Sequence, residues 1–268
     1  MRSSIVLPAL SCVGIAVALV AWMTPTPTAA EDFKPLFKPS LEITRTVGEI
    51  RIDGNLDEPA WKSAAHIDRF HERTPGDNTR PDVQTDVYLA YSDEKLYVAF
   101  DCRDDPSAIR ATMSQRDQWS GDDAVVVFLD TYSDATWAYQ LYVNPYGIQK
   151  DMLRSGFGPL DLGFDLIWES AARRTPTGYT VEMAIPFSSI RFPDQDLQSW
   201  RMDFWRSRPR EVLKQYSWAA NDRADECLPC QWGTVMGIKG VRPGRGLEIL
   251  PSTVAHQTGE IVNPQNPS

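Results

Sequence analysis

The stretch QTDVYLAYSDEKLYVAFDC, residues 84–102, is the clearest guide to the fold class. Apolar side chains alternate with other residues along both halves of it, at Val87, Leu89 and Tyr91 and then at Leu96, Val98, Phe100 and Cys102. Side chains on a strand point alternately to its two faces, so each half presents one apolar face to a core. The polar residues Ser92, Asp93 and Glu94 between the halves are typical of a tight turn. The stretch therefore predicts a β-hairpin that packs on one side.

Similar short runs, rich in β-branched and aromatic residues, recur before and after this hairpin. They lie at 41–46, 49–52, 124–130, 137–144, 148–153, 166–171, 179–185, 200–207, 216–219 and 234–238. Helical signal is confined to 59–65, where Pro59 suits a first helical turn, and to 186–190. No internal repeat of fixed period is present, which argues against a propeller or a solenoid. We therefore expect an all-β protein, a single antiparallel β-sandwich with one or two short helices.

Composition and charge narrow the class of protein. The chain has 268 residues, 27 of them basic and 36 acidic, for a formal net charge of −9. Apolar residues make up 42% and include 9 Trp, 9 Tyr and 10 Phe, which is too aromatic for a disordered chain. Affinity for a phosphate backbone comes from clustered Lys and Arg, and the sequence has no basic run. These figures indicate a folded domain and exclude nucleic acid as the expected partner.

The first 30 residues are typical of a secretory signal peptide. Arg2 precedes an apolar stretch at 5–23, and a spacer rich in Pro and Thr then leads to Ala30. Cleavage after Ala30 is the preferred interpretation, and a retained membrane anchor is the alternative because the stretch is near bilayer length. We expect an exported protein, in the periplasm or at the outer membrane or cell surface. A linker at 31–40, a folded domain at 41–241 and a hinge at 242–268 are expected to follow.

Two cysteines lie close together in Cys227-Leu-Pro-Cys230. A disulfide that clips a loop is the favoured interpretation for an exported protein. A thioredoxin-like redox motif should open a helix after a strand, and here the polar residues 221–226 come first. Zinc is less favoured because the chain offers no second ligand pair among His66, His71 and His256. We expect His66 and His71 to lie at the surface.

The sequence lacks the motifs of several enzyme classes. It has no G-x-S-x-G elbow, no Walker loop and no G-x-G-x-x-G after a strand. A glycoside hydrolase needs only two facing carboxylates, so Glu182 in a strand and Asp122-Asp123 in a turn are candidates. Solvated or ion-paired carboxylates are the commoner case, and we favour it here. The acidic residues at 104–105 and 117–123 can also offer oxygen ligands to a hard cation.

Tryptophans are candidates for a sugar platform, because sugar rings present flat C–H faces that stack on exposed aromatic side chains. Trp168, Trp205 and Trp218 lie in apolar runs and are better explained as core residues. Trp119 differs, since the surrounding stretch at 116–123 is polar and no strand is expected there to bury the indole. Trp119 is therefore the tryptophan that we expect to contact a ligand.

A second stretch, Ile52-Asp-Gly-Asn-Leu-Asp-Glu-Pro-Ala-Trp61, resembles the opening of carbohydrate-binding module family 9 domains. More matches follow in the same order and spacing, at 85–88, 96–99, 122–130, 143–144 and 178–182. The resemblance covers about residues 41–240. It implies the same β-sandwich, a carbohydrate partner, structural calcium, no required cofactor and no enzymatic activity.

Within that family the chain looks most like the domain at the N-terminus of large bacterial outer-membrane proteins that end in a β-barrel. The shared motifs are Arg116-Asp117, Leu129-Asp-Thr131, Val143-Asn-Pro-Tyr-Gly147, Trp168 and Ile185-Pro-Phe-Ser-Ser-Ile-Arg-Phe192. In that group a run like Leu247-Glu-Ile-Leu-Pro251 begins the barrel, so 242–268 is expected to hold a truncated start of it. The resemblance therefore implies an outer-membrane barrel as a partner in a full-length relative.

The resemblance also points to individual site residues. Sugar-binding members of the family clamp a terminal sugar between two Trp, and charged and amide side chains contact its hydroxyl groups. Trp119 matches the first Trp with an offset of one residue, whereas the second falls near Glu226. A strand Glu of the binding members falls at Val126, and a strand Arg falls at Tyr142. The candidate carbohydrate-binding residues are therefore Trp119, Arg116, Tyr142 and Asn144.

Three functions follow, in order of preference. We expect non-catalytic binding of β-linked glucan or xylan-type saccharides by an exported module that assists polysaccharide catabolism. The alternative is a periplasmic structural or plug-like module of an outer-membrane protein whose sugar site has decayed, which the missing second Trp favours. A glycoside hydrolase that cleaves O-glycosyl bonds is the weakest of the three, since no carboxylate pair stands out.

Overall fold

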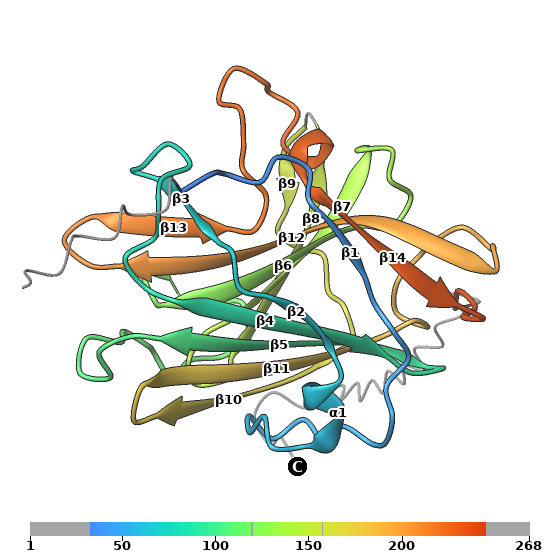
Figure 1. Ribbon diagram of the computed structural model, residues 1–268, viewed down its shortest axis with the longest axis horizontal. Helices are drawn as coiled ribbons and strands as arrows, with labels where there is room; N and C mark the ends of the chain where they lie inside the picture. The colour runs from blue at the N-terminus through green and yellow to red at the C-terminus, as the bar shows by residue number, and fades with distance from the viewer. Residues whose placement is uncertain (1–32, 119, 157, 245–268) are drawn as a thin grey trace, which may run out of the picture. The chain divides into compact units, whose positions relative to one another are not determined.

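The computed structural model describes residues 33–118, 120–156 and 158–244 (Figure 1). The chain divides into two compact units, residues 1–32 and 33–268, and all described residues belong to the second. The expected signal peptide, most of the expected hinge at 242–268 and Trp119 lie outside the described residues. Within these ranges no helix combines the length and the apolar character that a membrane span requires.

The larger of two β-sheets has nine strands in the order β1-β14-β12-β6-β7-β8-β9, and β13 and β3 extend it beside β12. β1 pairs parallel with β14, and the other pairs are antiparallel. Its strands are β1 (Ser40–Glu42), β3 (His71–Thr74), β6 (Ala124–Asp130), β7 (Trp137–Val143), β8 (Gln149–Ser155), β9 (Leu160–Asp161), β12 (Leu197–Pro209), β13 (Leu213–Ser217) and β14 (Gly233–Lys239).

The second sheet has five antiparallel strands in the order β10-β11-β5-β4-β2, of which Figure 1 shows β4, β5, β11 and β10 side by side. They are β2 (Ala65–Ile67), β4 (Thr85–Tyr91), β5 (Lys95–Arg103), β10 (Glu169–Thr175) and β11 (Gly178–Pro186). The predicted hairpin is β4 and β5, with Leu89 opposite Val98 and Val87 opposite Phe100.

The main core lies between the two sheets. Leu96, Val98 and Phe100 of β5 belong to one apolar cluster together with Val125 and Val127 of β6. All of these side chains are fully buried, and each contributes about 1.5–3 kcal/mol by leaving water. Two sheets with a shared apolar layer between them confirm the predicted β-sandwich.

The signature stretch 52–61 covers the outer face of the five-stranded sheet. Its Trp61, in the short helix α1 (Pro59–Lys62), packs in a second apolar cluster with Tyr97 of β5. Glu182 on β11 accepts hydrogen bonds from the Asp53 and Gly54 amides, at 2.9 and 2.8 Å, and from Trp61 Nε1 at 2.8 Å. One buried carboxylate therefore anchors both ends of the stretch to the sheet.

Gly54 is required by the same close approach. Its φ is +86°, and a Cβ at this position would lie 2.9 Å from the Ala172 carbonyl carbon on β10. A side chain would therefore strain the backbone and push the stretch away from the sheet. The spacing between Gly54 and Trp61 follows from this anchoring, because the Gly54 amide and the Trp61 indole bind the same carboxylate.

Some predicted elements differ from the structure. The run at 49–52 is extended but unpaired, and the run at 166–171 becomes a strand only at Glu169, where β10 begins. Leu166 and Trp168 still fill the core, which explains their strand-like pattern. The expected helix at 59–65 ends at Lys62, because Ala65 already pairs with Leu89 in β2. The stretch expected as a helix at 186–190 is a turn after β11.

The segment at 31–40, expected to be a linker, is bonded to the sheet where the structure describes it. The Leu36 amide donates to His71 Nε2 at 2.7 Å, and the Ala220 amide donates to the Leu36 carbonyl at 2.8 Å. Phe37 also forms a parallel bridge with Ala220. Hydrogen bonds therefore hold the described part of this segment against the nine-stranded sheet.

Candidate functional site

The outer face of the nine-stranded sheet carries the positions that the family resemblance singles out. Val126 on β6 lies directly opposite Tyr142 on β7 and opposite Trp205 on β12. The neighbouring residues Val125 and Val127 point into the core, so Val126, Tyr142 and Trp205 point away from it. They form a third apolar cluster, whose further members are Phe128, Ala138, Trp232 and Leu228.

The cysteine loop lies over this outer face. Cys227 and Cys230 form a disulfide, and the 3₁₀ turn η1 (Pro229–Gln231) contains Cys230. Leu228 and Trp232 pack on the face, with the Trp232 ring centroid 5.1 Å from that of Phe128. Glu226, where the family places its second Trp, is exposed one residue before the disulfide. The fold therefore brings this position to the same face as Val126 and Tyr142.

A cleft of about 270 Å³ opens on this face and includes Tyr142. Residue 119 is outside the described residues, but the two residues after it, Ser120 and Gly121, line the cleft. The other lining residues are Asp122, Ala124, Lys150, Met152, Ser207, Pro209 and Leu213. Of the four candidate residues, Tyr142 and the neighbours of Trp119 are thus brought together.

Arg116 belongs to a different place and is held by carboxylates. Its Nε and Nη2 donate to Asp151 Oδ1 at 3.1 and 2.5 Å, and Nη2 lies 3.3 Å from Asp165 Oδ1. Asp117 lies 3.7 Å from Nε. Arg116 also borders a separate shallow cleft with Trp168 and Gln149. Arg116 therefore pairs with the buried carboxylate of Asp151 and does not line the cleft at Tyr142.

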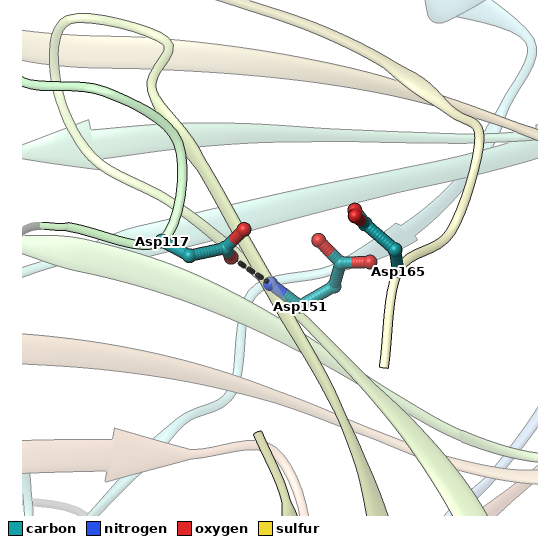
Figure 2. A group of neighbouring side chains, drawn as sticks. All are labelled: Asp117, Asp151 and Asp165. Atoms are coloured by element: carbon teal, nitrogen blue, oxygen red, sulfur yellow. Dashed lines mark hydrogen bonds between the residues drawn. The ribbon is translucent and has the colours of Figure 1, made fainter. Parts of the chain in front are cut away.

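The carboxylates around Arg116 are also the candidate ligands for a structural calcium ion. Asp117, Asp151 and Asp165 lie together, with one oxygen of each within 4.8 Å of the others (Figure 2). Both oxygens of Asp151 are occupied, Oδ1 by Arg116 and Oδ2 by the Leu166 amide. Burial raises the pKa of Asp151 although the Arg116 bonds oppose this. A guanidinium already fills the space between these oxygens, so the group does not fit a calcium ion.

The acidic residues that we considered for a cation hold other groups. Asp104 bonds to Arg206, Arg208 and Arg210, which lie on and just after β12. Burial raises its pKa, but these arginines outweigh that effect and lower it. Asp123 accepts from the same Arg210 at 2.8 Å. Both carboxylates therefore serve a buried ionic cluster.

Asn144 is buried and its amide is fully used. Nδ2 donates to the Thr112 carbonyl at 3.0 Å and to Asp122 Oδ2 at 2.9 Å. Oδ1 accepts from the Tyr146 and Ile148 amides, both at 3.0 Å. Two donors and one acceptor oxygen with two lone pairs are all that an Asn side chain offers. Asn144 therefore holds the loop after β7 to Thr112 and to Asp122, and Asp122 lines the cleft.

Two further residues differ from the sequence-based expectation. His71 was expected at the surface, but it is fully buried, where Nε2 accepts from the Leu36 amide and Nδ1 lies 3.3 Å from the Ser217 carbonyl. Glu182, a candidate catalytic carboxylate, is buried beneath the signature stretch and accepts hydrogen bonds from three N–H donors. Neither side chain can reach a ligand in solvent.

Trp137 is the aromatic residue that the sequence did not single out. Six of the seven tryptophans in the described residues are buried, whereas Trp137 at the start of β7 is 53% exposed. Its strand pattern resembles that of a core residue, because Tyr139, Leu141 and Val143 share its face. The alternation along β7 therefore gives no sign that the Trp137 side chain lies in solvent.

Comparison with protein families gives one match. The model of a family described as carbohydrate family 9 binding domain-like matches residues 52–205. These residues run from the signature stretch into β12 and include all of the five-stranded sheet and strands β3 and β6 to β9 of the nine-stranded sheet. They also include the part of the cleft lining from Ser120 to Met152. No curated protein matches the chain.

Solved structures similar to this chain share its fold at low sequence identity. A family 9 carbohydrate-binding module from Caldicellulosiruptor kristjanssonii in complex with cellotriose has 18% identity and a TM-score of 0.53, covering 79% of this chain and 100% of its own. A family 9 carbohydrate-binding module from the same organism in complex with glucose has 19% identity and a TM-score of 0.52, covering 78% of this chain and 100% of its own. A putative carbohydrate-binding protein from Bacteroides uniformis has 13% identity and a TM-score of 0.56, covering 74% and 98%.

Proposed function

The chain belongs to the carbohydrate family 9 binding domain-like family, and on this premise we propose that it binds a saccharide without cleaving it. The binding site is the cleft on the outer face of the nine-stranded sheet, which Tyr142, Ser120 and Gly121 line. The observation that carries the proposal is that Tyr142 and Ser120-Gly121, which are distant in sequence, line one cleft. One position that the family resemblance assigns to sugar contact thus lies together with the two residues that follow another such position in sequence.

The chemistry of the cleft supports a neutral, hydroxyl-rich ligand. Tyr142 and Met152 offer apolar surface, while Ser120, Ser207 and Lys150 offer hydroxyl and ammonium groups. Sites for small ligands combine apolar walls with a few polar groups in this way. A cleft of about 270 Å³ lies at the small end of such sites, so it suits the end of a saccharide chain better than a long segment.

The finer parts of the proposal concern the ligand and the setting. We take the ligand to be a β-linked glucan or xylan-type saccharide, and the protein to be exported as an accessory to polysaccharide breakdown. The solved structures with cellotriose and with glucose support the ligand class. The signal-like residues 1–30 support export, which fractionation of the source cells would test.

Titration of the protein with cellotriose, xylotriose and glucose tests the binding. We expect saturable heat or NMR shifts with at least one of these, which Trp119→Ala and Tyr142→Ala weaken about tenfold or more. Ile167→Ala is the control, because this residue is 78% exposed and lies outside the cleft. Sugar release should stay undetectable. Absence of binding to all three sugars, by protein that unfolds cooperatively, would overturn the proposal.

A second candidate function is a structural module with no affinity for sugar. One observation favours it: the Arg73 guanidinium lies 3.8 Å from the Trp205 ring centroid, so it covers an aromatic face that a sugar would need. Trp205 itself is only 7% exposed. Such a module would serve a larger outer-membrane protein. The same titration separates the two functions, because the structural module binds none of the three sugars.

A further inference from the structure

A second aromatic cleft lies on the opposite face of the strands that carry the first. It has a volume of about 500 Å³ and is lined by residues of β7, β8 and the loop before β7. Trp137 and Tyr139 of β7 and Leu153 of β8 belong to it, whereas Tyr142 and Met152 of the same two strands belong to the first cleft. Residues of odd and even number on a strand face opposite sides, so the two clefts are back to back.

The second cleft holds aromatic rings at the solvent surface. Trp137 is 53% exposed and Tyr132 is 54% exposed, although both have large apolar side chains. The floor is formed by Tyr139 and Phe164, whose ring centroids are 5.7 Å apart. The outward-facing rings therefore have a packed apolar layer behind them.

Polar groups of both signs surround these rings. Asp134, Thr136 and Arg191 line the cleft, and each of them is exposed. A carboxylate accepts hydrogen bonds and a guanidinium donates them in a plane, which suits neighbouring hydroxyl groups of a sugar. An acyl chain or an apolar helix would cover both charged groups without offering either of them a hydrogen bond, and is disfavoured.

The cleft is held in shape before any ligand arrives. Buried Asp130 accepts from the Ala135 amide at 2.9 Å, and Asp134 accepts from the Thr136 amide at 2.8 Å, so the 131–136 loop is fixed at two points. The Arg191 amide donates to the Tyr139 hydroxyl at 2.9 Å. A preformed site loses little conformational freedom when it binds.

We propose that the cleft at Trp137 is a second saccharide-binding site, in which the sugar ring stacks on Trp137 and Tyr132 while Asp134 and Arg191 bond its hydroxyl groups. The inference rests on the proposed function, because it takes the ligand class to be carbohydrate. Two sites on opposite faces let one module contact two glycan chains at once. Retention on a polysaccharide then exceeds the affinity of either site for an oligosaccharide.

NMR of the whole protein with ¹⁵N-labelled tryptophan tests the second site directly. The indole N–H signal of Trp137 is identified as the one that is lost in Trp137→Phe. We expect cellotriose to shift this signal in a saturable way, while the signal of fully buried Trp200 stays in place. Trp137→Ala should weaken this site about tenfold or more and leave binding at the first cleft intact. Because Trp137 is exposed, its replacement is not expected to disturb folding.

The outcomes separate this inference from the proposed function. If Trp119→Ala removes all binding and the Trp137 signal never moves, the second site is wrong and the first stands. If Trp137→Ala removes all binding while Trp119→Ala has no effect, the second site stands and the first is wrong. If cellotriose, xylotriose and glucose shift no NMR signal of the folded protein, both proposed sites are wrong.

Discussion

Arg116 shows how the surroundings of a single residue decide its role. The family resemblance made it a candidate for sugar contact, and the structure gives it three carboxylate neighbours and a carbonyl, that of Leu166 at 2.6 Å. Asp151 among them is fully buried. A buried carboxylate is stable only when it is paired, so Arg116 is tied to the folding of the loops around β8.

Replacing Arg116 by Leu should therefore lower stability. Asp151 would lose its charged partner, and we expect the free energy of unfolding to drop by about 3 kcal/mol, measured by urea denaturation. Asp165→Asn is the matched control, because its side chain is 79% exposed, and it should change stability by about 0.5 kcal/mol or less. Unchanged stability of Arg116→Leu together with lost sugar affinity would show that Arg116 contacts the ligand instead.

Glu182 is a second residue whose role depends on its partners. In the sequence it is one of 36 acidic residues, and in the structure its carboxylate receives two backbone amides and the Trp61 indole. Three donors converge on it because β11 passes directly beneath the signature stretch. Glu182, which the sequence offered as a candidate catalytic carboxylate, thus has a structural role.

Among the structural elements, the cysteine loop has the clearest local constraint. The disulfide joins residues three apart in sequence, and it fixes the backbone between the exposed Glu226 and the buried Trp232. Leu228, between the two cysteines, packs on the outer face with Trp232. The loop therefore closes one side of the face that carries the first cleft.

Removing this disulfide should have a small but measurable effect. Chain entropy predicts about 2 kcal/mol for so short a loop, less than for a long one. We expect the double variant Cys227→Ser/Cys230→Ser to lose about that much free energy of unfolding, with no change in fold by circular dichroism. Wild-type protein treated with a reducing agent should match the variant. A reduced wild type as stable as the oxidised protein would contradict the prediction.

For the whole molecule, buried ionisable groups set how stability depends on pH. Burial raises the pKa of Glu182 and of Asp203 to about 7, against the hydrogen bonds that each carboxylate accepts. In the unfolded chain these groups ionise near pH ~4. Their contribution to stability is therefore fully present below pH ~4 and is lost as the pH rises through about 7.

His71 has the opposite effect. Burial lowers its pKa, so the folded protein favours the neutral ring, which accepts a hydrogen bond from Leu36. Its contribution is fully present above the unfolded pKa of about 6.5 and is lost as the pH falls below that value. Two carboxyl groups with strongly raised pKa values outweigh this single histidine.

The net result should be a protein that is more stable in mild acid than at neutral pH. We expect the free energy of unfolding to fall between about pH 5 and about pH 7.5, by roughly 1 kcal/mol per pH unit at the steepest point. Urea denaturation at several pH values measures it. Glu182→Gln cannot titrate at this position, so its profile should be flatter than that of the wild type. A stability that rises steadily over this range would refute the assignment of these groups.

Period-two patterns account for most of the fold that sequence alone could predict. The hairpin at 84–102 and the runs that became β7, β11 and β14 were found because one face of each packs in the main core. The run that became β6 was found because it is apolar from Ala124 to Leu129, and it is buried on both faces. The local chemistry of a strand is enough for such predictions. The short strand β3 was not found, because its pairing depends on β13, which is distant in sequence. The strand β9 was not found because its two residues, Leu160 and Asp161, are too few to show a pattern.

What the sequence determined by itself is the all-β class, the two-cysteine loop and, through its ordered motifs, the family. Only the tertiary structure decided which polar residues are available to a ligand. In sequence, nothing separates Asn144, Arg116, His71 and Glu182 from exposed polar residues. In the structure each is hydrogen-bonded to a partner 22 to 129 positions away. Conversely, Trp137 follows the pattern of a core strand, yet its side chain is 53% exposed. Availability depends on what lies opposite a side chain in space, and that is set by long-range packing, which no local pattern contains.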